Sequence, residues 1–289
     1  MIRQIFYELI CIILFFDIFA FLTLKNKLYV MKNKYLWISL FIVLFTSIVL
    51  CFTLRKCNNT NAETAWLPLP LEPVPEQILF KRNYTISYNA DTKIPNWVAW
   101  HLTAEHADGD VRRPKNAWHE DSLVPFPRAT NNDYRNSGWS RGHLCPAGDN
   151  KWDKDAMYES FLFTNCCPQH KNLNSGDWNE IEISCRRWAQ KFGSVYIVCG
   201  PILFRQEHQT IGENKVVVPE AFFKVVVCLD GKPRGIGFIC RNCEGNRQKD
   251  FYSNTIYEIE RITGITFFPN LANDIAEVVK NSANLDDWK

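Results

Sequence analysis

A mixed α+β domain, preceded by a membrane-spanning helix, is the fold class predicted from this 289-residue sequence. Short runs rich in β-branched residues alternate with a few helical stretches, as is typical of α+β domains. An uncharged apolar run occupies residues 36–54. The composition, 46% hydrophobic and 22% charged, is that of a globular protein and excludes a fibrous or largely disordered chain.

The apolar run from Leu36 to Leu54 is long enough to cross the hydrocarbon core of a bilayer as a helix. Four lysines precede this run, whereas only Arg55 and Lys56 follow it closely, so the positive-inside rule places the N-terminal side in the cytoplasm. The C-terminal domain is then expected to be anchored to the membrane by this helix. It would be extracytoplasmic, in the periplasm or outside the cell. A cleaved secretion signal that starts at Met31 is the alternative, although no small-x-small cleavage site follows the run.

Three parts are expected along the chain. Residues 1–56 form the membrane segment, and residues 57–77 form a linker in which four prolines favour an extended chain. Residues 78–289 form the folded domain, whose strands and helices are predicted from β-branched runs and from apolar spacings of three and four. The expected strands are 84–88, 97–103, 161–165, 194–199, 215–218, 221–229 and 235–240. The expected helices are 153–160, 175–192 and 270–280, and residues 114–134 are expected to form a loop.

Cysteine usage leaves two interpretations open. All of the eleven cysteines except Cys11, Cys51 and Cys57 lie in the expected domain, which suggests an oxidising compartment and one or more disulfides. Alternatively, several of them are buried as small apolar residues. Cys240 and Cys243 are spaced as half of a zinc site or as a redox pair, but no second pair of ligands follows, so a local disulfide or no function is favoured.

The formal net charge of +2 neither favours nor excludes a nucleic-acid substrate, because only the surface that faces phosphate must be positive. Basic residues before the central motif could form such a surface, although a solvated basic loop would contain the same residues. They are Arg112, Arg113, Lys115, Arg128 and Arg135.

The segment Ser140-Arg141-Gly142-His143 contains groups suited to phosphodiester hydrolysis. A histidine, with an unperturbed pKa of about 6.5, can take the proton from an attacking water molecule at neutral pH. A hard divalent cation stabilises the charge that develops on phosphate oxygens, and it prefers oxygen ligands such as the amide of Asn174. An arginine can bind a phosphate with two donors at once.

Polar positions further along the chain complete a pattern that resembles the DNA/RNA non-specific endonuclease family. The resemblance covers about residues 84–281 and rests on four motifs in the family's order and spacing. These motifs are the Arg-Gly-His box at 141–143, Asn165 followed by Pro168-Gln169, the pair Leu173-Asn174, and a helix that carries Trp178 and Glu182.

The resemblance implies a central antiparallel sheet flanked by helices, with a ββα-metal (His-Me) finger on one side. His143, on a strand of this finger, would be the general base. Asn174, at the start of the finger's helix, would bind Mg²⁺ directly, with Mn²⁺ as a substitute, and Glu182 would bind the metal through water. The implied function is a Mg²⁺-dependent, sequence-nonspecific endonuclease that hydrolyses DNA and RNA and that could form a homodimer.

The resemblance also assigns Arg141 to phosphate binding, Arg186 to the neighbourhood of the scissile phosphate, and Asn165 to ordering the site. From the residues alone, Glu182 and Arg186 could instead form an ordinary salt bridge along a helix. Ser140 departs from the family, which usually has Asp at this position. A serine can hydrogen-bond but cannot position its neighbours by charge, so a change in rate or metal preference is expected.

Two other functions stay open. Ser140 motivates a catalytically impaired, membrane-anchored protein that binds nucleic acid without cutting it. The same groups could also serve a metal-dependent phosphodiesterase that acts on another substrate, such as a nucleotide or a lipid headgroup. Sequence-specific cutting is not expected, because the sequence contains no helix-turn-helix, zinc finger or other base-reading module.

Overall fold

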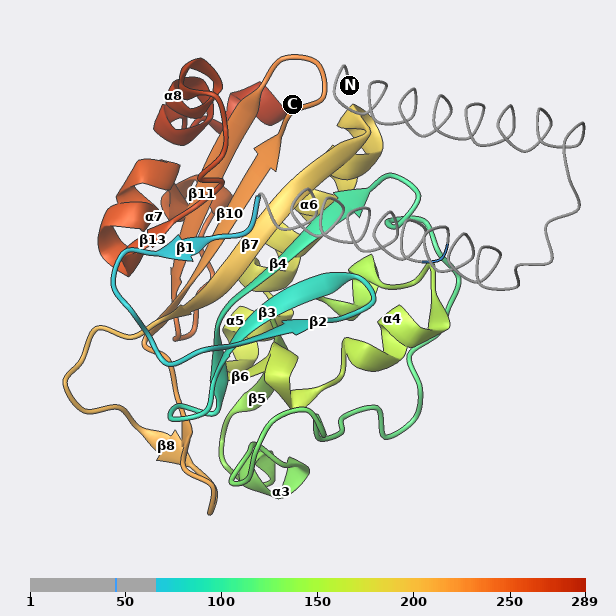
Figure 1. Cartoon of the computed structure of the whole chain (residues 1–289), viewed down its shortest axis with the longest axis vertical. Coiled ribbons are helices and arrows are strands. Elements are labelled where there is room, and N and C mark those ends of the chain that lie inside the picture. Colours follow the sequence, from blue (N-terminus) through green and yellow to red (C-terminus); the bar gives the residue numbers. More distant parts are fainter. Residues whose placement is uncertain (1–44, 46–65) are drawn as a thin grey trace, which may run out of the picture. The chain divides into compact units, whose positions relative to one another are not determined.

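The computed structural model describes Phe45 and residues 66–289, and the latter form an α+β domain on a central antiparallel sheet (Figure 1). Seven strands hydrogen-bond in the order β12-β11-β10-β7-β4-β3-β2, and every neighbouring pair is antiparallel. The predicted central antiparallel sheet is therefore confirmed. Its strands are β2 (Gln77–Phe80), β3 (Tyr84–Asn89), β4 (Ile94–Thr103), β7 (Ser194–Ile202), β10 (Ala221–Cys228), β11 (Arg234–Arg241) and β12 (Ser253–Asn254).

Apolar layers cover both faces of the sheet. Successive side chains of a strand point to opposite sides, so one strand contributes to both layers. In β10, Phe222 belongs to one buried cluster and Phe223 to the other. The helix α6 (Asp177–Phe192) contributes to the cluster of Phe222. The helices α7 (Ile256–Thr263) and α8 (Asn273–Asn281) contribute to the cluster of Phe223. Helices therefore flank the sheet on both sides.

A separate two-stranded antiparallel sheet on the α6 side of the central sheet contains the Arg-Gly-His motif. The strand β5 (Ser140–His143) pairs with β6 (Cys166–Gln169), and α5 (Lys171–Ser175) and α6 follow directly. Buried residues of β6 and α5 join the same core cluster as α6. The chain therefore has the expected ββα order, which we call the finger (Figure 1).

The helical part of the finger is interrupted, whereas a continuous helix over residues 175–192 was expected. Gly176 separates α5 from α6 with φ −105° and ψ −110°, outside the helical region. A Cβ at Gly176 would lie 2.6 Å from the backbone oxygen of Asn172, so only glycine fits this break. Asn174 therefore lies in the short helix α5 and not at the start of the long helix.

Residues 66–77, which fall within the expected linker, pack against the domain. Leu67 is buried, and the ring of Trp66 stacks on Phe268 at 6.4 Å. The strand β1 (Leu69–Pro70) pairs antiparallel with β13 (Ile265–Thr266). A proline-rich segment favours extended backbone, and extended backbone can also pair at an edge. The packed chain therefore begins before residue 78.

The predicted membrane helix at 36–54 lies outside the described residues, except for Phe45. Within the part of the chain that the structure describes, no helix is both long and apolar enough to cross a membrane.

Most of the other predicted elements are present with shifted ends, but the strand predicted at 161–165 is wrong. Residues Phe163–Asn165 form a 3₁₀ turn, and β6 begins directly after it. The segment is buried and largely apolar. A short buried turn and a short buried strand have the same apolar pattern, so periodicity cannot distinguish them. The strand β2 and the helix α7 were not predicted. The remaining short elements are α3 (Asn131–Tyr134), α4 (Lys154–Glu159), β8 (Thr210–Ile211) and β9 (Val216–Val217).

The cysteines of the domain are free thiols. None of the eight cysteines in residues 66–289 forms a disulfide, and all except Cys243 are buried. The expectation of disulfides is therefore wrong for this region, and the alternative of buried apolar cysteines is confirmed. Cys240 lies in the apolar cluster beneath α6, whereas Cys243 is exposed in the loop that follows β11.

Candidate active site

His143 lies at the end of β5, with its ring between two aromatic side chains. The ring centroids of Trp118 and Phe161 lie 4.5 Å and 4.9 Å away. Its Nε2 atom is buried and has no hydrogen-bond partner among the described residues. Burial, together with the positive charge of Arg113, lowers the pKa of His143 to about 3. The imidazole is therefore neutral at neutral pH, the form that can accept a proton.

Arg141 lies on the same face of β5 as His143, because residues two apart in a strand point to the same side. Its guanidinium donates to the side chain of Asn131 at 2.7 Å and lies 5.5 Å from the ring centroid of Tyr134. Its Nε is buried without a partner in the described part of the chain. Arg141 is thus held at one end and keeps donor capacity for an anion at the other.

Arg113 is a second cation beside His143, and the sequence did not single it out from its basic neighbours. Its guanidinium lies 4.7 Å from the ring centroid of Phe161, the ring whose edge meets His143. The side chain is exposed, so it can meet a phosphate from solvent. No sequence motif marks Arg113, because its place next to His143 depends on the long loop before α3.

Asn165 holds the backbone that follows His143. Its side-chain oxygen accepts from the backbone N–H of Cys145 at 2.9 Å, and its Nδ2 donates to the carbonyls of Cys145 and Ser160 at 2.8 and 2.9 Å. Its own carbonyl accepts from Leu144 at 3.0 Å. All these bonds are to backbone, so Asn165 orders the site and keeps none of its amide for substrate.

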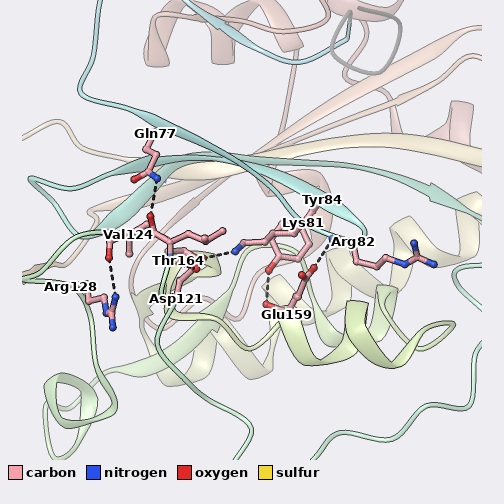
Figure 2. A network of polar contacts seen from close by, with 10 residues as sticks. Gln77, Lys81, Arg82, Tyr84, Asp121, Val124, Arg128, Glu159 and Thr164 are labelled. Carbon is pink, nitrogen blue, oxygen red and sulfur yellow. Dashed lines mark hydrogen bonds and ion pairs between the residues drawn. The ribbon is translucent and has the colours of Figure 1, made fainter. Parts of the chain in front are cut away.

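A network next to Asn165 fastens the same segment to the edge of the sheet (Figure 2). Thr164 donates to Asp121 at 2.8 Å, and Asp121 is paired with the ammonium of Lys81 at 2.7 Å. On the same side, the hydroxyl of Tyr84 donates to the carbonyl of Glu159 at 2.5 Å. The turn that carries Asn165 is therefore tied to the β2–β3 hairpin through buried polar contacts.

Asn174 lies in α5, which packs against β5. Its backbone N–H donates to the carbonyl of His170 at 2.9 Å. Its half-buried side-chain amide makes no hydrogen bond to the described residues, so its oxygen is available to a ligand. An amide oxygen is a hard donor that suits Mg²⁺.

Asn242, which the sequence gave no reason to select, fixes the chain just before α5. Its side-chain oxygen accepts from the backbone N–H of His170 at 2.7 Å. Its Nδ2 donates to the carbonyls of Pro168 and Pro219 at 3.0 and 2.8 Å. The amide thereby joins the end of β6 to the strand β11, across 72 residues of sequence in the case of His170.

The start of α6, just after α5, is held by the same C-terminal segment. Asp177 accepts a hydrogen bond from the hydroxyl of Tyr252 and another from the backbone N–H of Arg247 at 3.2 Å. Asn242 and Tyr252 therefore anchor the chain on both sides of Asn174.

The helix α6 carries Glu182 and Arg186 one turn apart. Arg186 donates to the Oδ1 of Asp149 at 2.8 Å, and the other oxygen of Asp149 accepts from the indole of Trp100 at 3.0 Å. The expected alternative, a salt bridge between Glu182 and Arg186, is not formed. Asp149 lies in a turn after β5 and is 1% exposed; the sequence gave no signal for its role.

The carboxyl of Glu182 is buried at the edge of this group. Burial raises the pKa of Glu182 to about 7, and the nearby cation Lys224 opposes this rise. Asp149 adds to the rise, whereas Arg186 opposes it. A cation that approaches Glu182 would therefore favour its ionised form.

The oxygen donors of Asn174 and Glu182 fit a hard divalent cation. Mg²⁺ commonly keeps several waters and takes one or two protein oxygens. The residues that the structure describes contain no group of three or more His, Cys, Asp or Glu that could hold a metal. This donor set therefore suits Mg²⁺ or Mn²⁺ and is unsuited to a closed zinc site.

Ser140 lies on the face of β5 away from His143. It pairs in register with Gln169, which is 1% exposed. A Cβ at Gly142, on the same face, would lie 2.3 Å from the Oε1 of Gln169. The replacement of the family's usual Asp therefore changes the packing side of β5, not the side that carries His143 and Arg141.

Comparison with known proteins gives a consistent set of relatives. A family model described as DNA/RNA non-specific endonuclease matches residues 71–274. The mitochondrial nuclease EXOG of Mus musculus is 34% identical over 72% of this chain and 60% of its own length. The mitochondrial endonuclease G of Homo sapiens is 32% identical over 68% of this chain and 70% of its own length.

A solved structure also matches the fold. The match is to the crystal structure of an EndoG/EndoGI complex, which concerns the mechanism of EndoG inhibition, with a TM-score of 0.67 and 28% identity. It covers 73% of this chain and 94% of the matched chain. This chain spans about 60% of the length of the EXOG relatives from mouse and human.

Proposed function

The chain belongs to the DNA/RNA non-specific endonuclease family, and we propose that it is an endonuclease that hydrolyses phosphodiester bonds of DNA and RNA without sequence preference. The observation that carries this proposal is the packing of α5 against β5. It sets a neutral histidine with an unpartnered Nε2 beside a helix whose Asn174 amide is available. Family membership supports the reaction class, and this geometry supports the assignment of roles.

In this proposal His143 is the general base. Its neutral ring can accept the proton of a water molecule that attacks phosphorus, and a positioned base of this kind contributes roughly 10²- to 10⁴-fold to a rate. Trp118 and Phe161 fix the ring plane, and Asn165 fixes the backbone that follows it. Proton transfer then requires no rearrangement of the ring.

Asn174 would hold Mg²⁺ directly, and Glu182 would hold one of its water molecules. The bound cation supplies positive charge where phosphate oxygens become more negative. The protein's own part is to keep Asn174 in place through the anchors at Asn242 and Asp177. Mn²⁺, which also accepts oxygen ligands, is expected to substitute.

Arg141 and Arg113 would bind the phosphate groups on either side of the scissile bond. Both guanidinium groups lie around His143 and keep free donors or exposed surface. Arg186 is paired with Asp149, so its role is to orient that carboxylate and to contribute charge near the scissile phosphate.

The test is cleavage of circular plasmid DNA and of RNA by the full-length chain, with Mg²⁺ and with EDTA. We expect the wild type to nick and then degrade plasmid only with Mg²⁺, and His143→Ala to lose this activity. A matched control is His119→Ala, because His119 also has an unpartnered Nε2 but stacks on Tyr158 at 4.0 Å, outside the site.

Two results would overturn the proposal in different ways. If folded wild type binds DNA but cuts neither DNA nor RNA with Mg²⁺ or Mn²⁺, the chain is the impaired binding protein that Ser140 suggested. If it cuts only small diesters, it is a phosphodiesterase on another substrate.

The location and assembly of the chain are further parts of the proposal. The apolar run at 36–54 supports an anchor in a membrane, with the nuclease domain on the extracytoplasmic side. The relatives from mouse and human are named as mitochondrial proteins. Alkaline extraction of membranes, protease protection and light scattering of the purified chain test the anchor, its orientation and a homodimer, respectively.

A further inference from the structure

Lys224 is a buried cation in the middle of the sheet. It lies in β10, is 0% exposed, and has seven apolar neighbours along the strand, which reads Ala-Phe-Phe-Lys-Val-Val-Val-Cys. Its Nζ has no hydrogen-bond partner within residues 66–289. Instead, it lies 5.0 Å from the ring centroid of Trp100 and 4.4 Å from that of Trp178.

This position is unfavourable for a residue that serves stability alone. A buried ammonium loses its hydration, and a well-packed apolar side chain of similar volume is commonly at least as stable. Burial disfavours the charge, but the faces of two indole rings, at 5.0 and 4.4 Å, attract an ammonium electrostatically. Lys224 is therefore a charged group at neutral pH in a strand that would otherwise be entirely apolar.

Each indole that contacts Lys224 leads to a residue of the candidate site. The Nε1 of Trp100 donates to Asp149 at 3.0 Å, and Asp149 accepts from Arg186 at 2.8 Å. Trp178 lies four residues before Glu182 on α6, so the two side chains lie on the same side of the helix. The ammonium therefore contacts the indole that donates to Asp149 and an indole one helical turn from Glu182, and it is shielded from solvent.

We propose that Lys224 is a positioning residue for phosphodiester cleavage. This buried cation supports the Asp149–Arg186 pair through the indole of Trp100, and Glu182 through the indole of Trp178. Lys224 cannot touch nucleic acid, because it has no exposed surface. It acts on the reaction through the two carboxylates and through the indoles that support them. This inference rests on the proposed function, in which Glu182 and Arg186 take part in cleavage.

The decisive variant is Lys224→Met, which removes the charge and keeps most of the volume. We expect kcat for DNA cleavage to fall by roughly 10- to 100-fold, the usual effect of losing a residue that orients metal-site groups. The KM for DNA should stay within about twofold, because a buried residue adds no contact with the substrate. The melting temperature should be unchanged or higher.

The matched control is Lys280→Met. Lys280 is also buried, but it pairs with Glu260 at 2.7 Å and packs on the other face of the sheet. Its loss leaves Glu260 without its partner, so the melting temperature should fall while kcat and KM stay at the wild-type values. The two lysines should therefore give opposite patterns of stability and activity.

A double-mutant cycle tests whether Lys224 acts through Glu182. It uses a second variant, Lys224→Gln, in case Lys224→Met does not fold. Lys224→Gln alone should slow cleavage, but it should add little to Glu182→Gln, because both changes act on the same group. Multiplicative effects of the two changes would overturn the inference, as would wild-type kcat in folded Lys224→Met. Failure of both Lys224 variants to fold would make Lys224 a structural residue and would also overturn it. If the wild type cleaves no nucleic acid, the proposed function fails first and this inference falls with it.

Discussion

Two polar regions meet at the segment Trp118-His119, and they differ in how their charges are used. Trp118 packs on His143 in the candidate active site, whereas its neighbour His119 lines a cavity of about 470 Å³. We call this space the flanking cavity; it is also lined by Lys81, Arg82, Glu120, Asp121, Ser122, Leu123, Asp155, Tyr158, Glu159 and Leu162.

Three ion pairs involve charged residues that line the flanking cavity. Lys81 pairs with Asp121 at 2.7 Å, Arg82 with Asp153 at 3.3 Å, and Glu120 with Arg128 at 2.8 Å. In the candidate site, by contrast, Nε2 of His143 and Nε of Arg141 are buried and unpartnered within the described chain.

The comparison teaches that the flanking cavity, despite its volume, is not the best candidate for catalysis. Native proteins satisfy nearly all buried polar groups, so a cluster of unsatisfied ones indicates partners that come from outside the protein chain. The paired charges of the flanking cavity stabilise the fold and hold the turn that carries Asn165. The unpaired groups of the finger are those to which the proposed function assigns the substrate and the cation.

The largest expected effect breaks the buried pair of the flanking cavity. Asp121→Ala leaves the ammonium of Lys81 buried without a partner and should lower the free energy of unfolding by about 3–5 kcal/mol. Glu120→Ala, which removes the more exposed pair with Arg128, should cost no more than about 1 kcal/mol. Urea denaturation measures both, and equal losses would show that burial of the pair does not matter.

Asn174→Ala should have a large effect on activity and little effect on stability. It removes the proposed direct metal ligand, so the loss should exceed the roughly 10- to 100-fold that is typical when only a supporting residue is removed. The melting temperature without metal should stay close to the wild type, because the amide makes no hydrogen bond to the described residues. A variant with unchanged cleavage at low Mg²⁺ would remove Asn174 from the metal site.

Asn242→Ala sharpens the comparison, because it changes a paired polar group that supports the finger. It removes two hydrogen bonds to the chain just before α5 and one to the carbonyl of Pro219. We expect roughly 10- to 100-fold weaker use of Mg²⁺, measured as the concentration for half-maximal cleavage. Asn281→Ala is the control, because Asn281 bonds only within the exposed end of α8. A normal Mg²⁺ requirement in Asn242→Ala would argue that α5 holds its place without this anchor.

The smallest expected effect is the pH dependence of cleavage, which Glu182 should set. Burial raises the pKa of Glu182 to about 7, so cleavage should decrease as pH falls through 7 and Glu182 takes up a proton. His143, with its pKa lowered to about 3 by burial and Arg113, stays neutral over this range and does not set the limb. Initial rates from pH 5.5 to 9 should show this limb, and more Mg²⁺ should shift it to lower pH.

The protonation of Glu182 should affect stability with the opposite sign: stability should decrease, not increase, as pH rises. Its folded pKa lies above its ordinary value of 4.5, so its contribution is fully present below pH 4.5 and is lost as pH rises through 7. His143 has a depressed pKa, so its contribution is lost as pH falls below 6.5 toward 3. Unfolding measured across this range for the wild type and Glu182→Gln separates the two. The same slope in both proteins would contradict the assignment to Glu182.

Local sequence patterns were sufficient for much of the fold. Runs rich in β-branched residues predicted β3, β4, β7, β10 and β11, and spacings of three and four predicted α6. These patterns depend on which side of a strand or helix is buried, and that information is contained in a few consecutive residues. The motif around His143 likewise identified the finger, because its residues are close together along the chain.

Tertiary structure supplied what local patterns do not contain. The strand order, the pairing of β1 with β13 and the break at Gly176 depend on contacts between distant segments or on one close approach. The partners of the finger follow the same rule: Arg186 meets Asp149 across 37 residues, and His170 meets Asn242 across 72. Lys224 stood in the sequence as a lone charge in an apolar strand. Its meaning depends on the two indoles and two carboxylates that surround it, because the energy of a buried charge is set by its three-dimensional neighbours and not by its neighbours along the chain.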